Sequence, residues 1–483
     1  MADQLLRKQE SSTSLHGDRS LILGVDIGTT SVKVCIIDSA AQKCIKQLSK
    51  DTQANVPSEL GSEGNKQHVP KIISALHGCI SRLPREALRR VEKVGICGQM
   101  HGCVLWKSGR AWSRKPDTNT YDIDEVSHLY TWQDTRCTPE FLSSLPAPDS
   151  HLGVHSGYGV ATLLWFLRHK PQKLQLYDRS GTIQDLVVAM LCDLDTPVMS
   201  VQNAASWGYF NTQTAQWNTE LLKGAGLPLS LLPSVVGSGQ AAGRLHSSWL
   251  GLPAGTPVMA ALGDLQCSVL PLLTCNATAA LNVSTSAQLA LLLPDGFQPP
   301  TAAAETGCIS YLPFLDGRYL AVAAALTGGN AMAAFVQMLQ RWTQELGFNV
   351  PQSVVWTKIL SLADSAAASP TTTSTELHIV PTVRGERHAP HQRATVTGVT
   401  VDNTGLGHVT DAICRGIAAN LDSMMSREWL SLRGVTRLVG TGSALARNAA
   451  LRRAFQKTYQ VPLQMADETS AAYGAALAAA RCL

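Results

Sequence analysis

Two segments of the chain share one pattern, in which two β-rich stretches enclose a turn of small polar residues. Residues 21–38 (LILGVDIGTTSVKVCIID) show it near the start, and residues 278–293 (TAALNVSTSAQLALLL) show it after the middle. β-Branched residues favour the strands, and Gly28 favours a tight turn between the first pair. Helical patterns follow in both halves. The repeat is one of architecture and not of residue identity, and it predicts two related α/β domains that face each other.

The length of the chain supports the same organisation. Its 483 residues exceed what one hydrophobic core usually serves, which favours two large domains with a cleft between them. We expect a disordered tail at residues 1–20, a first domain at 21–265 and a second at 266–483. The strand PVMAALGD ends at Asp264, immediately before the predicted boundary.

Composition excludes several classes of protein. The formal charge of +4 is small for this length, and no basic stripe suits nucleic acid or a membrane surface. The first twenty residues lack the apolar core of a signal peptide, and no apolar run approaches the ~18 residues of a membrane span. The twelve cysteines are scattered without a CxxC pair, which indicates reduced thiols that mostly fill the core. These features predict a cytoplasmic protein without nucleic-acid or membrane partners.

The first candidate site is the run Asp26-Ile27-Gly28-Thr29-Thr30-Ser31. A phosphate chain needs backbone N–H groups and hydroxyl donors close by, and a glycine lets the main chain come near. An aspartate at the strand end can hold magnesium through water, because Mg²⁺ prefers oxygen ligands and keeps several waters. The alternative is a plain β-hairpin with a glycine turn.

Two further motifs follow predicted strands. Gly263-Asp264 places a carboxylate after a buried strand, where it can accept a proton from an attacking hydroxyl, although Gly-Asp turns are also common without a function. The run 440–444 (GTGSA) can let a flat ring such as adenine lie against the backbone, or can simply begin a helix. The chain has no GxGxxG run at this point and no Walker loop, which disfavours the Rossmann and P-loop classes.

The order of these motifs is more specific than any one of them. The chain carries a DxGTT hairpin, a Gly-Asp pair, a Ser-Thr turn and a GTGSA loop before a final helix of small residues. From about Leu21 to the C-terminus it resembles the actin-like ATPase fold and, within it, the FGGY carbohydrate kinases. Further family-like runs are 98–102 (GQMHG), 132–136 (WQDTR), 203–206 (NAAS) and 385–387 (GER). The resemblance implies two RNase H-like domains facing each other across a deep cleft.

The resemblance also implies a role for individual residues, with ATP and Mg²⁺ as cofactors. Asp264 is expected to be the catalytic base, and Asp26 and Asp264 are expected near magnesium, through water. The residues expected to bind the nucleotide are Gly28, Thr29, Thr30, Lys33, Thr285, Gly328, Gly329, Gly442, Ser443 and Asn448. Those expected to bind the sugar with Asp264 are Gln99, Met100, His101, Trp132, Asp134 and Arg136. His101 could equally be a satisfied structural histidine.

The substrate implied is a ketose. GQMHG is similar to the ketopentose and ketoheptose kinases of the family, whereas glycerol kinases carry an Arg-Glu pair there. The runs WQDTRC, QNAASWGYFNTQ and GERHAP closely resemble the animal members that act on sedoheptulose. The reaction implied is in-line transfer of the γ-phosphate of ATP to the terminal hydroxyl, giving sedoheptulose 7-phosphate for the pentose phosphate pathway.

Two departures from the family pattern bear on that substrate. Leu265 follows the expected base, where Gln or Asn is frequent, and Ser284-Thr285-Ser286 replaces a glycine-flanked turn. The alternatives are a kinase of another ketose such as xylulose or ribulose, an actin-like ATPase that assembles or binds partners, and a catalytically silent sugar sensor. We expect a monomer or a homodimer.

Overall fold

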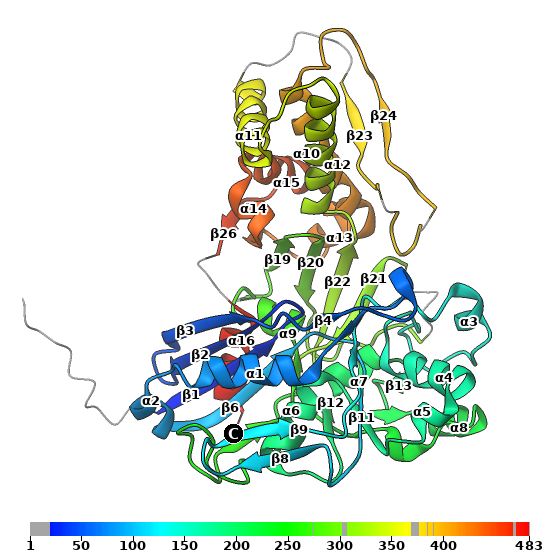
Figure 1. Ribbon diagram of the computed structural model, residues 1–483. Helices are drawn as coiled ribbons and strands as arrows, with labels where there is room; N and C mark the ends of the chain where they lie inside the picture. The colour runs from blue at the N-terminus through cyan, green and yellow to red at the C-terminus, as the bar shows by residue number, and fades with distance from the viewer. Residues whose placement is uncertain are drawn as a thin grey trace, which may run out of the picture.

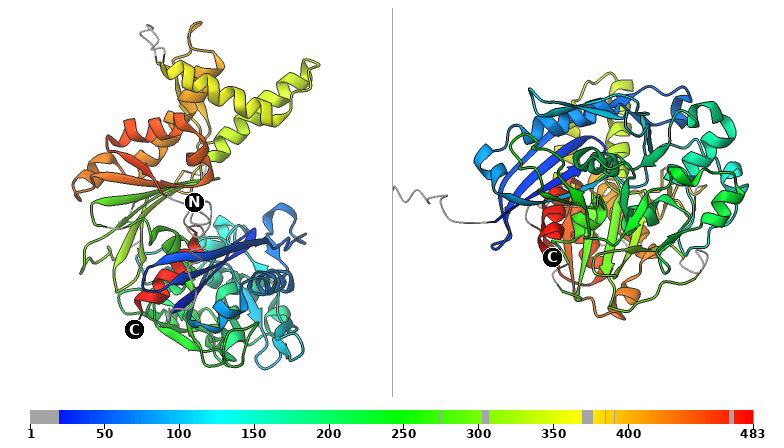
Figure 2. Two further views of the ribbon diagram at one scale, coloured as in Figure 1. Left: turned by 90° about the vertical axis from the view of Figure 1, so that its left-hand side faces the viewer. Right: turned by 90° about the horizontal axis from the view of Figure 1, so that it is seen from below.

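The computed structural model describes residues 20–273, 275–301, 307–368, 376–383, 385–389, 391–466 and 470–482. The predicted tail, apart from Ser20, lies outside this part of the chain. The Ser/Ala/Thr-rich run 364–376 predicts a surface loop, but residues 364–368 belong to a helix, and residues 369–375 lie outside the described chain. The described chain forms two lobes, each built on its own β-sheet, one above the other (Figures 1 and 2).

The first sheet occupies the lower lobe of Figure 1 and has the strand order β16-β17-β6-β1-β2-β3, with β18 also paired to β6. Strands β1, β2 and β3 run antiparallel, whereas β6 runs parallel to β1. Its strands are β1 (Leu21–Ile27), β2 (Ser31–Asp38), β3 (Lys43–Asp51), β6 (Val91–Gly98), β16 (Ala241–Arg244), β17 (Pro257–Met259) and β18 (Leu262–Gly263).

The second sheet has the order β21-β22-β20-β19-β25-β26 and repeats the arrangement of the first. Strands β19, β20 and β22 run antiparallel, and β25 runs parallel to β19. Its strands are β19 (Thr278–Val283), β20 (Ala287–Leu292), β21 (Ile309–Pro313), β22 (Tyr319–Ala325), β25 (Arg437–Thr441) and β26 (Leu463–Met465). The predicted fold class, two related α/β domains, is therefore confirmed.

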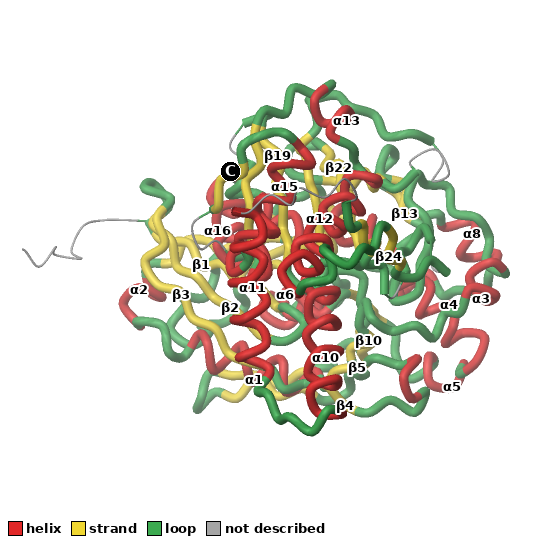
Figure 3. The backbone as a smooth tube through the Cα atoms, turned by 90° about the horizontal axis from the view of Figure 1, so that it is seen from above, coloured by secondary structure: helices red, strands yellow, loops and turns green. Residues whose placement is uncertain are grey.

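Helices cover the outer face of each sheet. Alternate residues of β1 pack with α1 (Val69–Ile80) and α6 (Ile183–Cys192) in one core. Over the second sheet, Figure 3 shows α10 (Gly329–Glu345), α11 (Gln352–Ala368), α12 (Leu406–Met424) and α15 (Ala449–Tyr459). Two short helices, α13 (Arg427–Ser431) and α14 (Ser443–Arg447), complete this lobe together with the hairpin of β23 (His378–Val380) and β24 (Thr395–Thr397).

A third core lies between the sheets and contains α9 (Asp264–Val269) and the last helix, α16 (Ala471–Arg481). Although α16 ends the chain, it packs on β1, β2 and β6 of the first sheet. Glycines make this approach possible: a Cβ at Gly24 would lie 1.9 Å from the carbonyl oxygen of Ala472, and one at Gly95 would lie 2.2 Å from that of Ala475. The predicted division at residues 21–265 and 266–483 stays a prediction.

Between β6 and β16 the chain builds the right-hand part of the lower lobe in Figure 1, which has its own core. Its larger helices are α4 (Gly159–His169) and α7 (Val201–Trp207). The other elements of the first lobe are β4 (Asn55–Val56), β5 (Lys66–Gln67), α2 (Arg85–Arg89), β7 (Val104–Trp106), β8 (Trp112–Lys115), β9 (Thr120–Ile123), β10 (Leu129–Tyr130), α3 (Pro139–Ser143), α5 (Pro171–Leu174), β11 (Arg179–Gly181), β12 (Val198–Ser200), β13 (Phe210–Asn211), β14 (Gln216–Trp217), α8 (Thr219–Gly224) and β15 (Ser234–Val236), with 3₁₀ turns at Gly61–Glu63 and Leu229–Leu231.

The polar run 107–124 is so rich in turn formers that its sequence predicts no core element, and this prediction is wrong. The run forms the β8–β9 hairpin and buries Tyr121 in the first core. Its turn formers supply the tip of the hairpin, where Asn119 has a φ of +51°. Among the residues that the structure describes, no helix has both the length and the apolar character to cross a membrane.

Candidate active site

A cavity of about 390 Å³ lies where the two sheets meet, and both lobes contribute to its wall. It unites the predicted phosphate hairpin, the predicted base and the GTGSA loop. The lining residues are Asp26, Gly28, Thr29, Thr30, Ser31, Lys33, Asp264, Ser268, Asn282, Ser284, Thr441, Gly442, Ser470 and Ala471.

The hairpin between β1 and β2 forms one wall of this cavity. The N–H of Gly28 donates to the carbonyl of Ser31 over 3.0 Å and closes the turn. Asp26 lies opposite Lys33 in the strand register, and its side chain is almost fully buried. Burial raises the pKa of Asp26 to about 6, although the positive charge of Lys33 acts in the opposite direction.

Asp264 stands at the first position of α9, directly after β18. Its Oδ1 accepts a hydrogen bond of 2.8 Å from the N–H of Leu265. Burial, followed by the nearby negative charge of Asp26, raises the pKa of Asp264 to about 7. A carboxyl group with this pKa is partly ionised at neutral pH and can accept a proton from a hydroxyl.

The donor set of the cavity fits a magnesium ion. Two carboxylates disfavour each other's charge there, and a divalent cation between them would relieve that cost. Within the described ranges, no group of three or more His, Cys, Asp or Glu side chains is arranged to hold a metal. A magnesium ion held by Asp26 and Asp264 would therefore complete its shell with water and phosphate oxygens, as Mg²⁺ commonly does.

A second cavity, of about 550 Å³, opens in the upper lobe and shares Ser284 with the first. Four predicted nucleotide residues line it, namely Thr285, Gly329, Ser443 and Asn448. Trp356, Met332 and Leu360 add apolar surface opposite the small residues of the loop. An apolar slot with a few polar groups beside a phosphate-sized cavity suits the base and ribose of a nucleotide.

Backbone geometry explains two of the predicted glycines. Gly442 has a φ of +98°, and a Cβ there would lie 2.3 Å from the carbonyl oxygen of Val283, so this position requires glycine. Gly328 precedes α10, and a Cβ there would lie 2.4 Å from the backbone of Ser286. Gly328 thus supports the second hairpin without lining either cavity.

The serine that replaces a family glycine makes a specific bond. Ser284 Oγ accepts a hydrogen bond of 3.3 Å from the N–H of Ser443. This bond joins the second hairpin to the GTGSA loop at the point where the two cavities meet. The departure noted in the sequence therefore adds a contact to the nucleotide wall.

The GQMHG run begins at Gly98, the last residue of β6, which pairs with Gly263 of β18; none of its residues lines either of the two cavities. Met100 packs against Gly263, the neighbour of Asp264. Gln99 Nε2 donates to Gln67 Oε1 over 3.1 Å, and Gln67 Nε2 donates to the carbonyl of Thr29 over 2.7 Å. Gln99 Oε1 is buried and has no hydrogen-bond partner among the described residues, so it can accept a bond from a ligand hydroxyl.

His101 lies in an aromatic group that sequence reasoning did not find. Its ring stacks on Tyr158 with 4.4 Å between centroids, and its Nδ1 lies 2.8 Å from the carbonyl oxygen of Ser206. Burial lowers the pKa of His101 to about 4, and the positive charge of Arg387 acts in the same direction. Burial, followed by the Arg387 charge, also lowers the pKa of His155, which packs edge-on against Tyr158. The predicted alternative of a structural histidine stays open.

Trp132 and Arg387 come from opposite lobes and lie near the GQMHG loop and its aromatic neighbours. Trp132 is partly exposed, and its Nε1 donates to Thr29 Oγ1 over 3.1 Å. Glu386, the neighbour of Arg387, is buried and accepts bonds from the N–H groups of Leu326 and Thr327. The GERHAP loop is thereby anchored to the end of β22.

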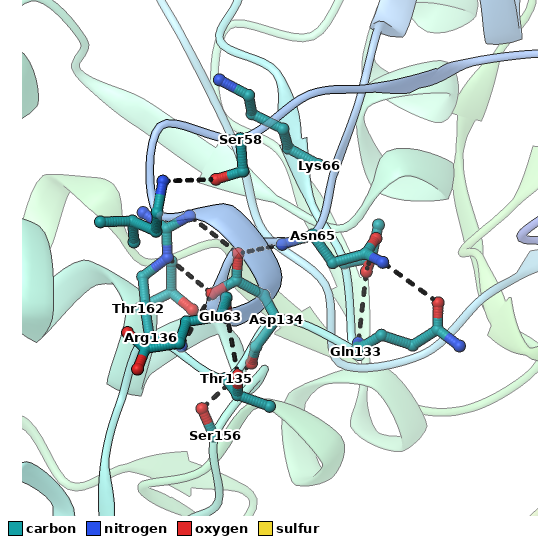
Figure 4. A network of polar contacts seen from close by, with 12 residues as sticks. Ser58, Glu63, Asn65, Lys66, Gln133, Asp134, Thr135, Arg136, Ser156 and Thr162 are labelled. Atoms are coloured by element: carbon teal, nitrogen blue, oxygen red, sulfur yellow. Dashed lines mark hydrogen bonds and ion pairs between the residues drawn. The ribbon is translucent and has the colours of Figure 1, made fainter.

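Asp134 and Arg136 were expected to contact the sugar, but in the structure they form an ion pair with each other (Figure 4). Arg136 donates from Nε and Nη2 to the two carboxylate oxygens of Asp134, over 2.6 and 2.8 Å. The N–H of Asn65 also donates to this carboxylate, over 2.9 Å. The Arg136 side chain is 1% exposed and that of Asp134 is 0% exposed. This geometry favours a structural role, in which the pair fixes the loop that carries Trp132.

Several residues of the cavities carried no recognised motif. Ser268 stands one helical turn after Asp264 and donates to its carbonyl oxygen over 2.7 Å, so an i, i+4 search along α9 could have found it. Ser470 caps α16 and could have been found as a helix-start signal. Trp356 and Arg447 come from helices without any local signature, and only the fold brings them to the nucleotide cavity.

Comparison with known proteins gives consistent results at three levels. Residues 21–271 match the model of the N-terminal domain of the FGGY family of carbohydrate kinases, and residues 296–483 match that of its C-terminal domain. The chain is 45% identical to sedoheptulokinase from Homo sapiens over 469 residues, and 45% identical to sedoheptulokinase from Mus musculus over 470 residues. Each alignment covers 95% of this chain and 97% of the relative. Among solved structures, it resembles xylulose kinase from Rhodospirillum rubrum with a TM-score of 0.77 at 18% identity, covering 95% of this chain and 89% of that one.

Proposed function

The chain belongs to the FGGY family of carbohydrate kinases, and we propose that it transfers the γ-phosphate of ATP to the terminal hydroxyl of sedoheptulose. As a member of this family it is a phosphotransferase with an alcohol group as acceptor. The observation that carries the choice of sugar is the 45% identity to two sedoheptulokinases over nearly the whole length of both chains. Family membership also favours a kinase over an assembling ATPase or a silent sensor.

Asp264 is the group that we assign as catalytic base. It lines the cavity that also holds the phosphate hairpin, and a pKa near 7 suits proton transfer at neutral pH. The carboxylate orients the sugar hydroxyl toward the γ-phosphorus and takes its proton as the new P–O bond forms and the bond to ADP breaks. Positioning supplies much of the rate in such a transfer.

The phosphate chain lies against Gly28, Thr29 and Thr30, whose backbone and hydroxyl groups supply donors, while Lys33 supplies positive charge. A magnesium ion, held by Asp26 and Asp264 through water, would neutralise developing charge on the transferred group. The base and ribose occupy the second cavity, between Trp356 and the Ser443–Asn448 segment. Every predicted nucleotide residue except Gly328, which supports the hairpin, lines one of the two cavities.

The sugar lies next to Asp264, on the side where the GQMHG loop packs against Gly263. Gln99 Oε1 offers a buried acceptor, and the His101–Tyr158 stack offers a flat wall with polar edges. Sites that pair with hydroxyls reject analogues that lack them, because their own polar groups would stay unpaired. The cytoplasmic location and the monomeric or homodimeric state stay predictions.

A substrate panel tests the proposal directly. Purified protein with Mg-ATP is offered sedoheptulose, xylulose, ribulose, fructose or glycerol, and ADP release is followed in a coupled assay. We expect kcat/KM for sedoheptulose to exceed that for every other sugar by tenfold or more. A preference for another ketose would retain the kinase and replace the substrate. ATP binding without sugar-stimulated ADP release would support a sensor, and sugar-independent hydrolysis with filaments would support an assembling ATPase.

The role of Asp264 is tested with Asp264→Asn, which keeps the shape of the side chain and the bond to the N–H of Leu265. General-base catalysis contributes about 10²- to 10⁴-fold, so kcat should fall by that factor while ATP still binds. The matched control is Asp122→Asn, which removes an exposed carboxylate on β9 and should leave kcat unchanged. A near-normal kcat in Asp264→Asn would show that another group accepts the proton.

A further inference from the structure

The β2–β3 hairpin holds two cysteines in contact that are nine residues apart in the sequence. Cys35 Sγ on β2 lies 3.3 Å from Cys44 Sγ on β3. Cys35 is fully buried, whereas Cys44 is exposed to solvent. Both are free thiols in the structure. One accessible thiol thus lies directly against one protected thiol.

The strand register explains the contact. Cys44 pairs with Ile37, and the ladder is irregular between Ile36 and Ile37. Because Cys35 and Ile37 are two residues apart, they share a face, and Cys44 joins them on that face as a diagonal neighbour of Cys35. A disulfide needs its sulfurs about 2.0 Å apart. Since β3 is the edge strand of the sheet and mostly exposed, it can make that small approach.

Two hydrogen bonds connect this hairpin to the start of α16, and one of them is made by a residue of the phosphate cavity. Gln47 of β3 lies opposite Cys35 in the register, and its Oε1 accepts a bond of 2.9 Å from Ser470 Oγ. The Tyr473 hydroxyl donates to the carbonyl of Gln42 over 2.7 Å. Ser470 lines the cavity that contains Asp26 and caps α16, the helix that covers Cys35. A shift of β3 would therefore act directly on Ser470 in the wall of this cavity.

We propose that Cys35 and Cys44 are a reversible oxidation site, in which a small organic disulfide such as oxidised glutathione converts the two thiols to an intramolecular disulfide and weakens nucleotide binding. The Cys44 thiol loses its proton, and its sulfur attacks one sulfur of the small disulfide, whose S–S bond breaks to release one thiol. The Cys35 thiol then loses its proton, and its sulfur attacks Cys44 Sγ to release the second thiol. Two protein thiols are oxidised by two electrons, and one small disulfide is reduced to two thiols.

Accessibility fixes the order of these steps. Burial, with the hydrogen bond and charge of Cys44, raises the pKa of the Cys35 thiol well above its usual range, so Cys35 is a poor first nucleophile. Cys44 is the sulfur that a dissolved reagent reaches. Once Cys44 is in a mixed disulfide, Cys35 is the thiol placed to resolve it.

Tryptic mapping of the full-length protein tests the proposal. After exposure to oxidised glutathione and a thiol block, cleavage at Lys33, Lys43 and Lys46 places the two cysteines in VCIIDSAAQK and CIK. We expect these peptides to appear as one linked species that reductant separates. The Kd of Mg-ATP, measured by direct binding without sugar, should rise at least twofold on oxidation and recover with reductant.

The control variants isolate the pair. Cys44→Ser alters an exposed side chain, so it should fold, bind ATP normally and lose the response to oxidised glutathione. Cys275→Ser removes another exposed cysteine and should respond as the unaltered protein does. A stable glutathione adduct on Cys44 without the link to Cys35 would overturn the proposed site. Complete linkage with an unchanged Kd of Mg-ATP would overturn its connection to the nucleotide.

Discussion

The buried pair of Asp134 and Arg136 could either contact the substrate or support the structure of its loop. The substitution Asp134→Asn distinguishes these two roles. The substitution keeps the size of the side chain but removes its charge. Arg136 then stays buried over the rings of Tyr130, Trp165 and Phe166, with 4.4 to 5.1 Å from its guanidinium carbon to their centroids, and without a counter-charge.

The expected loss of stability follows from the geometry. The wild-type carboxylate accepts from Nε and Nη2 of Arg136 and from the backbone N–H of Asn65. An amide has one oxygen, so its NH₂ group must face one of these donors. Breaking a buried pair by removing one partner costs about 3–5 kcal/mol. At about 2–4 °C per kcal/mol for a domain of this size, the melting temperature should fall by roughly 10 °C.

The assay is thermal unfolding followed by circular dichroism, with sugar kinetics at 25 °C on the folded enzyme. Asp122→Asn is the matched control, because its ion pair with Lys115 is exposed and worth at most about 1 kcal/mol. Asp134→Asn combined with Arg136→Met should recover part of the loss, since it also removes the unpaired charge. An unchanged melting temperature with a tenfold higher KM for the sugar would refute the structural role and restore the substrate contact.

Three other substitutions test separate parts of the structure. Ser284→Gly removes the acceptor for the N–H of Ser443, and a bond worth about 1 kcal/mol predicts a KM for ATP about fivefold higher; an unchanged KM would show that the bond does not support the nucleotide. Burial raises the pKa of Asp185 to about 7, so the folded state keeps a proton that the unfolded state has lost, and stability falls as pH rises from about 4 to 7. Asp185→Asn cannot ionise, so its melting temperature relative to wild type should be higher at pH 8 than at pH 5; an equal difference at both would contradict the pKa. Gly95→Ala places a methyl group 2.2 Å from the carbonyl oxygen of Ala475, and overpacking of about 1–3 kcal/mol should lower the melting temperature, whereas an unchanged value would show that α16 shifts freely.

The sequence supported the sheets and the phosphate hairpin because their signals are local. Strand, glycine turn and strand are consecutive in β1 and β2, and β19 and β20 are likewise joined by a short turn, Ser284-Thr285-Ser286. Asp26 is the next-to-last residue of β1, and Asp264 and Gly442 directly follow β18 and β25, so the fold brings all three to one cavity. The sequence likewise predicts a helix at Asn330–Leu346, and the observed α10 begins and ends within one residue of these bounds.

The sequence could not supply contacts that depend on distant packing. Asp134 and Arg136 belong to a family motif that implies sugar contacts, and only the fold shows that both are buried and that Arg136 lies over the rings of Tyr130 and Phe166. Nothing local distinguishes Cys35 and Cys44 from the other scattered cysteines, because their contact depends on an irregularity in the β2–β3 ladder.

The last helix shows why the position of a segment along the chain is a poor guide to its place in the site. The run 471–481 is rich in alanine, a composition that suits a helix without naming its partner. The partner is set by Gly24 and Gly95, more than 370 residues earlier, because only strands without a Cβ at these points admit the backbone of α16 so closely. That packing carries Ser470 to the same cavity as Asp26. The phosphate wall therefore depends on both ends of the chain, and a change at this helix should act on nucleotide binding as directly as a change in the first hairpin.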